Sequence, residues 1–339
     1  MAKFARLDVL NTMLRTGLVP VFYHSDVAVA KQVASACAAG GSPLLEFTNR
    51  GDFAPEVFKE LSRGLAKDAP DTILGVGSVT DAPTAALYVA YGANFVVGPV
   101  LSEEVARFCN RRKIPYMPGC GSASEIAQAE ELGVEIVKVF PGDSVGGPGF
   151  VKSILGPMPW TRIMPTGGVE ATQESIQAWF KAGVAAVGIG SQLIRKDLIE
   201  KGDYEAMATK VAQTLGWIRQ ARGTPLFLGI EHPGLYPYGG AGARQIADWY
   251  SDTFGFKLNE GNSSIFVEGP GGGRIEVMKE GDTDRAHIAV LVSDFEQATA
   301  ALRAKGVELE QPNLKANIKA VYLKQADPAG NRIHLLWRR

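Results

Sequence analysis

The sequence predicts an α/β protein in which a (β/α)8 barrel of the TIM type precedes a smaller α+β domain. Apolar runs alternate with helix-like segments through the first 200 residues, as in a parallel barrel. A short linker, Gln220–Pro225, follows the last expected helix of the barrel, Tyr204–Arg219. Beyond the linker the pattern changes to short strands around two helices. We therefore expect two domains, at residues 1–222 and 226–339.

Eight apolar or β-branched runs have the length and composition of barrel strands. They are Leu18–Tyr23, Leu44–Thr48, Thr72–Val79, Asn94–Val97, Ile114–Met117, Ile136–Phe140, Arg162–Pro165 and Ala185–Ile189. Segments between them, such as Asp26–Ala39, Ala54–Ala66 and Thr172–Ala182, repeat apolar residues every three to four positions, which is typical of helices. Ser122 followed by Glu125 matches a capping box and indicates a helix start after the fifth strand.

The last third of the chain reads as an internal duplication at low sequence similarity. Two helices are expected, at Gly242–Thr253 and Phe295–Lys305, each set among short strands, and a glycine-rich turn spans Gly269–Gly273. Two successive units of this kind predict paired βαβββ modules.

Composition excludes several classes of function. The chain has 339 residues, 46% of them hydrophobic and 21% charged, and its net charge is −1. This balance offers no electrostatic footprint for nucleic acid and no polybasic patch for a membrane. No apolar run approaches the ~18 residues of a membrane helix, and the first residues do not resemble a signal peptide. Cys37, Cys109 and Cys120 are odd in number and lack zinc-type spacing. We expect a cytoplasmic protein with reduced thiols.

Lys138 interrupts an otherwise apolar run, Ile136–Pro141, which reads as a buried strand. Burial disfavours the charged ammonium and lowers the pKa of a lysine from ~10.4 toward the ~7–8 that suits an amine nucleophile. Such an amine attacks ketones and forms a Schiff base. The alternative is a structural lysine, whose stem is buried while its ammonium reaches solvent at the strand end.

Glu46 and Arg50 share one face of the second strand and its end, together with Thr48. Leu44 begins the same set, so this face is expected to point into the barrel. The carboxylate can shuttle a proton, and the planar guanidinium can bind a substrate carboxylate. The alternative is a structural ion pair that ties two loops together.

Two glycine-containing loops follow the seventh and eighth strands. These loops are Pro165–Gly168, which includes Thr166 and Gly167, and Gly188–Ser191, which includes Gly190. Glycine lets backbone N–H groups approach an anion, and the loops after strands 7 and 8 commonly bind phosphate in such barrels. The sequence therefore predicts a site for a phosphate or another polar group here.

Seven segments together resemble the 2-keto-3-deoxy-6-phosphogluconate / 2-keto-4-hydroxyglutarate (KDPG/KHG) aldolase family. They are LLEFTNR, GVGSV, VVGP, PGCGSASE, IVKVFPGDSVGG, IMPTGG and GIGSQLI, in family order over about residues 17–195. The resemblance implies class I cleavage of a 2-keto-3-deoxy(-6-phospho) sugar acid or 2-keto-4-hydroxy acid. The products would be pyruvate and an aldehyde such as glyceraldehyde 3-phosphate or glyoxylate. It also implies a barrel without a cofactor and a homotrimer.

The resemblance assigns roles to individual residues. Lys138 falls on the Schiff-base lysine, Glu46 on the acid/base glutamate and Arg50 on the arginine that binds the substrate carboxylate. The distal hydroxyl or phosphate end of the substrate would be held by Thr166, Gly167, Gly168, Gly190 and Ser191. Two substrate-binding positions depart from the family pattern. Ser78 stands where threonine is common, and Pro99 lies in Gly-Pro-Val instead of Ser-Pro-Gly, beside the expected pyruvoyl group.

Three of the four histidines and one glutamate fall on expected strands after the linker. His232, Glu276, His287 and His334 could converge in one cupped sheet. Three imidazoles and a carboxylate suit a divalent transition metal such as Zn, Mn, Fe, Ni or Co.

The segments ADWYSDTFGF, HIAVLVSDFEQA and DPAGNRIHLLW resemble the vicinal oxygen chelate (glyoxalase-like) superfamily over Leu226–Arg339. The common ligand pattern there is His/Gln, Glu, His, Glu, and here His334 takes the last place. The resemblance implies a metal-dependent reaction, which we expect to use a related sugar acid. Two alternatives stay open. The barrel could be a phosphosugar isomerase or epimerase, and the second domain a non-catalytic ligand-binding or oligomerising module.

Overall fold

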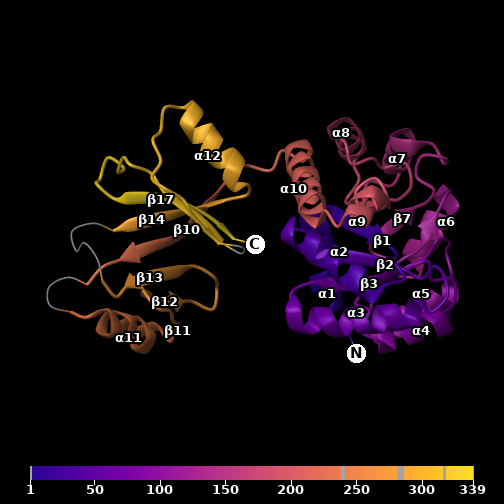
Figure 1. The fold of residues 1–339 in the computed structure, drawn as a ribbon, viewed down its shortest axis with the longest axis horizontal. Coiled ribbons are helices and arrows are strands. Elements are labelled where there is room, and N and C mark those ends of the chain that lie inside the picture. Colours follow the sequence, from indigo (N-terminus) through magenta and orange to yellow (C-terminus); the bar gives the residue numbers. More distant parts are fainter. Residues whose placement is uncertain (1, 238–240, 281–285, 316–317, 339) are drawn as a thin grey trace. The chain divides into compact units, whose positions relative to one another are not determined.

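The computed structural model describes residues 2–237, 241–280, 286–315 and 318–338. It divides into two compact units, Met1–Gly223 and Thr224–Arg339 (Figure 1). The first unit opens with helix α1 (Arg6–Thr16) and then alternates strands with helices. Its strands are β1 (Leu18–Phe22), β2 (Leu44–Thr48), β3 (Ile73–Gly77), β4 (Val96–Val97), β5 (Tyr116–Met117), β6 (Gly119–Cys120), β7 (Val137–Val139), β8 (Ile163–Pro165) and β9 (Val187–Ile189).

Helices follow the strands on the outside of this unit (Figure 1). They are α2 (Val27–Ala39), α3 (Ala54–Asp68), α4 (Ala82–Ala90), α5 (Glu103–Arg112), α6 (Ala123–Glu131), α7 (Gly147–Leu155), α8 (Gln173–Ala182), α9 (Lys196–Lys201) and α10 (Tyr204–Ala221). The capping box at α6 is present: the Ser122 hydroxyl accepts the Glu125 N–H at 3.3 Å, and the Glu125 carboxylate accepts the Gly121 N–H at 2.9 Å. This reciprocal pairing satisfies donors that the first turn leaves free.

The parallel strands close into a barrel, which confirms the predicted fold class. The sheet runs β5-β4-β3-β2-β1-β9, with β1 and β9 parallel, and a second ladder runs β6-β7-β8. A bridge between Thr166 and Gly188 joins the end of β8 to β9. The fifth strand, predicted at Ile114–Met117, contains β5, and the unpredicted β6 follows it beyond Pro118, whose nitrogen has no hydrogen to donate to the ladder. Counted as one strand, this pair completes the eight.

Helix α1 closes the amino-terminal end of the barrel. Its buried residues Val9, Leu10 and Met13 pack with apolar side chains that alternate strands point inward. The strand contribution to this cluster is Val19, Leu44, Ile73, Phe95, Val97, Met117, Ile136, Met164 and Ala186. Neighbouring strand residues, such as Val137 and Val139, belong instead to the larger cluster beneath the helices. The inward side chains therefore form an apolar floor.

The second unit is one eight-stranded sheet in the order β11-β12-β13-β10-β14-β17-β16-β15. Its elements are β10 (Phe227–Leu235), α11 (Ala243–Phe254), β11 (Lys257–Glu260), β12 (Ser264–Glu268), β13 (Arg274–Met278), β14 (His287–Val292), α12 (Phe295–Ala304), β15 (Asn313–Lys315), β16 (Ile318–Tyr322) and β17 (Arg332–Arg338). In each half the first strand pairs in parallel with the last, β10 with β13 and β14 with β17. This repetition confirms the predicted pair of βαβββ modules.

Each half of the sheet buries one face beneath its helix. Ile265, Val267 and Val277 pack with Ala247 of α11, while Val292 and Leu335 pack with Ala298 of α12. The alternate residues of the same strands therefore face the other side, where the sheet forms a cup. Among the described residues, no helix has the length and apolar character needed to cross a bilayer.

We expect Leu10→Ala to lower the free energy of unfolding by about 2–5 kcal/mol, because it leaves a cavity where α1 meets the barrel floor. Leu7 lies on the same helix but is 68% exposed, whereas Leu10 is 5% exposed. Leu7→Ala is the matched control and should change the free energy by less than ~0.5 kcal/mol. Urea denaturation of the full chain measures both free energies of unfolding. Equal effects of the two substitutions would contradict the packing of α1 against the barrel floor.

Candidate active site and candidate metal centre

Lys138 and Glu46 lie in the barrel interior, one layer above the apolar floor. Lys138 is the middle residue of β7 and is 5% exposed; Glu46 is the middle residue of β2 and is 1% exposed. Strand alternation explains both positions, because Ile136 and Leu44, two residues earlier, belong to the floor. The two strands stand four places apart around the closed barrel, so the two side chains approach from opposite walls.

The electrostatics of this pair favours its neutral forms. Burial lowers the pKa of Lys138 from its ordinary value of 10.5; the negative charge of Glu46 opposes this shift, and the positive charge of Arg50 adds to it. Burial raises the pKa of Glu46 from 4.5, against the opposing charges of Lys138 and Arg50. A deprotonated amine can attack a carbonyl carbon, and a protonated carboxyl group can donate its proton. The interior therefore holds an amine and a carboxyl group whose pKa values are shifted toward each other.

Two glycines make space for the side chains of Glu46 and Thr166. A Cβ atom on Gly77 would lie 1.9 Å from Oε1 of Glu46, and one on Gly188 would lie 2.4 Å from Oγ1 of Thr166. Within the described part of the chain, Oε2 of Glu46 and Oγ1 of Thr166 are buried without a hydrogen-bond partner. Buried polar atoms are usually satisfied, so such atoms in an enclosed site are ready to bind a ligand.

The loop after β2 holds Arg50 at the mouth of the barrel. Arg50 is exposed, and its Nε donates to the hydroxyl of Ser78 at 3.4 Å. Ser78 directly follows β3 and has a φ of 60°, a conformation that non-glycine residues rarely adopt and that often marks functional sites. Pro99, which follows β4, lies against Gly119: a Cβ on that glycine would be 2.2 Å from the Pro99 carbonyl oxygen. Both predicted substrate-binding positions thus border the strand ends.

Sequence reasoning missed a residue that supports this loop. The buried Tyr88 of α4 donates its hydroxyl to Oδ1 of Asn49 at 2.7 Å, one residue before Arg50. Tyr88 lies 39 positions away on a helix whose apolar pattern gives no sign of a polar partner. The one local signal was Asn49 itself, a polar residue directly after a buried strand.

The glycine loops lie at the same end of the barrel. Gly167 and Gly168 have φ values of 83° and 75°, which favour glycine. The loop is tied to the one after β7, because the Asp143 N–H donates to the Gly167 carbonyl at 3.2 Å. Gly190 accepts two backbone N–H groups at the end of β9, and the adjacent Ser191 is exposed. Ser191 lines a hollow of about 610 Å³ with Thr172, Arg195 and Lys210, among others.

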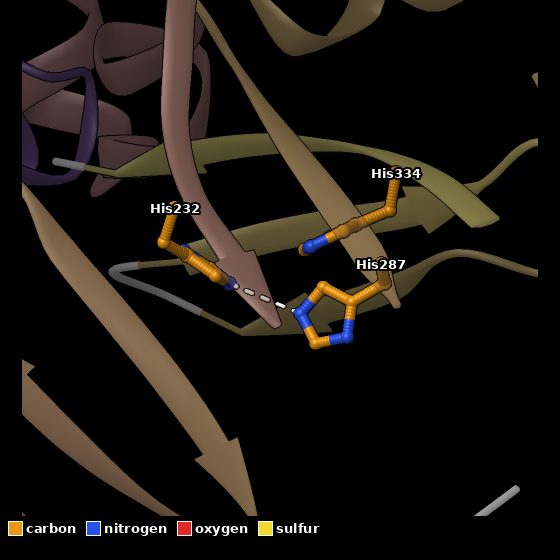
Figure 2. Close-up of side chains that lie close together, drawn as sticks. All are labelled: His232, His287 and His334. Atoms are coloured by element: carbon orange, nitrogen blue, oxygen red, sulfur yellow. Dashed lines mark hydrogen bonds between the residues drawn. The ribbon is translucent and has the colours of Figure 1, made fainter. Parts of the chain in front are cut away.

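The three histidines of the second unit converge inside the cup (Figure 2). His232 comes from β10, His287 from β14 and His334 from β17, and all are buried. One ring nitrogen of each lies within 4.8 Å of the others. His232 and His287 approach at 3.2 Å between their Nε2 atoms. Gly234 makes room for His287, because a Cβ on that glycine would lie 1.9 Å from the imidazole.

Glu276 on β13 completes this cluster. Its Oε2 lies 2.9 Å from Nε2 of His232 and 3.2 Å from Nε2 of His287, and its Oε1 accepts the Ser264 hydroxyl at 2.6 Å. Burial raises the pKa of Glu276, but the hydrogen bonds from His232, His287 and Ser264 outweigh this effect and lower the pKa below 4.5. The carboxylate is therefore charged at neutral pH.

The four side chains fit a metal by their chemistry. Burial, followed by the charges of His287 and His232, lowers the pKa of His334 to about 4, which keeps its ring neutral at pH 7. Both ring nitrogens of His334 are buried without a hydrogen-bond partner within the described ranges. Neutral imidazole nitrogens and a carboxylate are the donors that divalent transition metals prefer. The structure thus brings together all four predicted ligands.

Comparison with known proteins covers both units. Residues 9–210 match the KDPG and KHG aldolase family, and residues 241–335 match the Glyoxalase/Bleomycin resistance protein/Dioxygenase superfamily. A KHG/KDPG aldolase of Escherichia coli is 32% identical over 204 residues, 60% of this chain and 92% of that protein. A 2-dehydro-3-deoxy-phosphogluconate aldolase of Pseudomonas aeruginosa is 35% identical over 202 residues, 60% of this chain and 88% of that protein.

Solved structures agree with the sequence comparison. The KDPG aldolase of Legionella pneumophila, captured with pyruvate as a covalent carbinolamine intermediate, superposes with a TM-score of 0.55. It is 27% identical, and the match covers 60% of this chain and 96% of that one. The corresponding aldolase of Zymomonas mobilis, solved with 3-phosphoglycerate, gives a TM-score of 0.53 at 27% identity, covering 61% and 96%.

We expect Gly77→Ala to destabilise the barrel by about 1–3 kcal/mol, because the added methyl group would overlap the Glu46 carboxylate. The cost should fall in a Glu46→Ala background, where the overlapping atoms are gone. Gly149→Ala is the control, since a Cβ at Gly149 meets nothing within 4 Å. A double-mutant cycle by urea denaturation measures the coupling, and additive effects would contradict the proximity of Glu46 and Gly77.

Proposed function

The chain belongs to the KDPG and KHG aldolase family, and from this premise we propose how its barrel acts on a substrate. The barrel cleaves a 2-keto-3-deoxy sugar acid, phosphorylated or not, or a 2-keto-4-hydroxy acid to pyruvate and an aldehyde. The observation that carries the proposal is the buried amine of Lys138 in one enclosed interior with the carboxyl group of Glu46. The names of the relatives, which are KHG/KDPG and 2-dehydro-3-deoxy-phosphogluconate aldolases, support this substrate class.

Lys138 begins the proposed reaction as the nucleophile. Its neutral Nζ adds to the C2 ketone, Glu46 gives its proton to the departing C2 hydroxyl, and loss of that water forms an iminium ion. Glu46, as carboxylate in this step, takes the proton of the C4 hydroxyl. The C3–C4 bond then breaks, its electron pair moves into the enamine, and the aldehyde leaves. Glu46 returns the proton to C3, and hydrolysis of the iminium releases pyruvate and restores the amine.

The other predicted site residues bind and orient the substrate in this proposal. The Arg50 guanidinium pairs with the substrate carboxylate, beside Ser78 and Pro99. The distal hydroxyl or phosphate end contacts the loops after β8 and β9, where Thr166 offers a buried hydroxyl without a partner in the described ranges. These loops contribute Gly167, Gly168, Gly190 and Ser191.

An isomerase or epimerase on this barrel is less well supported. Such an enzyme needs a second acid or base at the opposite rim and has no use for a buried amine nucleophile. Among the described residues of the barrel, Glu46 is the one buried carboxylate and Lys138 the one buried amine. This pairing favours imine chemistry.

We further propose that the second unit holds a divalent transition metal through His232, Glu276, His287 and His334. The unpartnered ring of His334 and the match to the glyoxalase superfamily support this proposal. A bound ion would act as a Lewis acid toward a substrate oxygen. The residues themselves hold the donor atoms close together, and Ser264 orients the Glu276 carboxylate through its hydrogen bond at 2.6 Å. The reaction that we propose for this unit uses a sugar acid related to the barrel substrate.

Borohydride reduction of the protein with pyruvate should attach a pyruvyl group to Lys138, as mapped by peptide mass spectrometry. Lys138→Met should lose the adduct and the cleavage activity, whereas Lys152→Met, which changes an exposed lysine, should keep both. Because burial lowers the pKa of Lys138 below 10.5, the trapping rate should rise with pH and level off below pH 10.5. An adduct that persists in Lys138→Met would overturn the mechanism.

Elemental analysis after dialysis should find close to one divalent transition metal ion per chain. His334→Ala should lower this occupancy sharply, because a three-donor set binds more weakly. His24→Ala removes a histidine of the barrel whose ring accepts the Asp26 N–H, and it should leave the occupancy unchanged. Wild-type protein that retains no metal and binds none on addition would refute the metal centre, without bearing on the aldolase proposal.

A further inference from the structure

Glu231 occupies an irregular position directly before His232. The pairing of β10 with β14 shifts register there: Ile230 pairs with Val290, but His232 pairs with Ala289. Glu231 is thus an extra residue on β10, which defines a β-bulge. In a regular strand neighbouring side chains point to opposite faces. At the bulge this alternation is interrupted, so the two neighbouring side chains can meet. Oε2 of Glu231 forms a hydrogen bond with Nδ1 of the adjacent His232.

Two arginines from other strands hold the Glu231 carboxylate in place. Arg274 of β13 and Arg338 of β17 both pair with its Oε1, the latter at 3.4 Å. The side chains of Glu231 and Arg274 are 12% and 17% exposed, so this pairing is largely shielded from water. These ion pairs hold the Glu231 carboxylate beside Nδ1 of His232.

We propose that Glu231 is the positioning residue of the metal centre: through its hydrogen bond with Nδ1 of His232 it holds that ring with Nε2 toward the other donors. The inference rests on the metal site proposed above. Nε2 of His232 lies 2.9 Å from Oε2 of Glu276. That atom faces the other donors of the cluster. A carboxylate behind a ligating imidazole fixes its orientation and raises its basicity.

The other two histidines are held less firmly. Nδ1 of His287 lies 3.4 Å from the hydroxyl of Tyr236, a neutral partner at a longer distance. His334 stacks on Tyr322, with ring centroids 4.7 Å apart and an interplanar angle of 25°. Of the three rings, His232 is therefore the one whose Nδ1 pairs with a carboxylate. Its orientation is restrained from both sides, by Glu231 at Nδ1 and by Glu276 at Nε2.

Co²⁺ titration of the chelator-treated full chain tests this inference, because the visible absorption of Co²⁺ reports binding without any activity. Glu231→Ala should weaken Co²⁺ binding about 10–100-fold, the usual cost of losing such a partner. Glu231→Gln keeps an oxygen that can accept the Nδ1 proton, so it should lose less. Glu268→Gln is the matched control: it removes another carboxylate paired with Arg274, at 3.5 Å, and should bind Co²⁺ as the wild type does.

A ¹⁵N–¹H spectrum of the Zn²⁺-loaded protein provides the second readout. The Nδ1 proton of His232 should exchange slowly with water in the wild type and in Glu268→Gln, and faster in Glu231→Ala, which removes its hydrogen-bond partner. If Glu231→Ala does not fold, Glu231→Gln is read in both experiments. Unchanged affinity together with an unchanged exchange rate of the Nδ1 proton would overturn the role of Glu231 alone. Wild-type protein that binds no Co²⁺ would overturn the metal proposal and this inference with it.

Discussion

The cost of placing an amine and a carboxyl group inside an apolar barrel is the constraint on which the first unit depends. Transfer of either ion from water to such an interior is unfavourable, and the two groups respond by shifting toward neutral forms. The apolar floor built by α1 and the strand interiors closes this environment at its amino-terminal end. The glycines beside Glu46 and Thr166 provide room without adding atoms. Burying Lys138 and Glu46 lowers the stability of the fold, and the same burial shifts their pKa values toward the neutral, reactive forms.

The second unit solves a related problem with a different chemistry. Three buried imidazoles would repel one another if protonated, and burial keeps His334 neutral. The single carboxylate of Glu276 accepts hydrogen bonds from the other two rings and from Ser264. Because the two halves of the sheet repeat, β10 and β14 each supply a histidine, while β13 and β17 supply unlike residues at the corresponding place. The two halves thus build the same scaffold. The difference between Glu276 in the first half and His334 in the second sets the chemistry of the donor atoms.

Much of the fold was predictable from the sequence, because period and composition determine which residues form strands and helices. All eight barrel strands, the split between the two modules and the capping box at Ser122 followed from local patterns. The gathering of His232, Glu276, His287 and His334 was also expected, since alternation placed each on a strand. The contacts between residues far apart in the sequence could not be predicted. The hydrogen bond of Tyr88 to Asn49 and the bulge at Glu231 depend on register and on side-chain reach, which no local pattern encodes.

Closure of the barrel by α1 also determines the end at which substrate, products and water enter and leave. With the amino-terminal end filled by Val9, Leu10 and Met13, exchange with solvent takes place at the end where Arg50 and the glycine loops lie. In the proposed reaction the aldehyde is the outer fragment and departs first, while the three-carbon fragment stays tethered to Lys138 deeper in. Water for the final hydrolysis enters by the route the aldehyde has just vacated. In the proposed reaction, the closed floor therefore makes both products leave, and water enter, through the same end of the barrel.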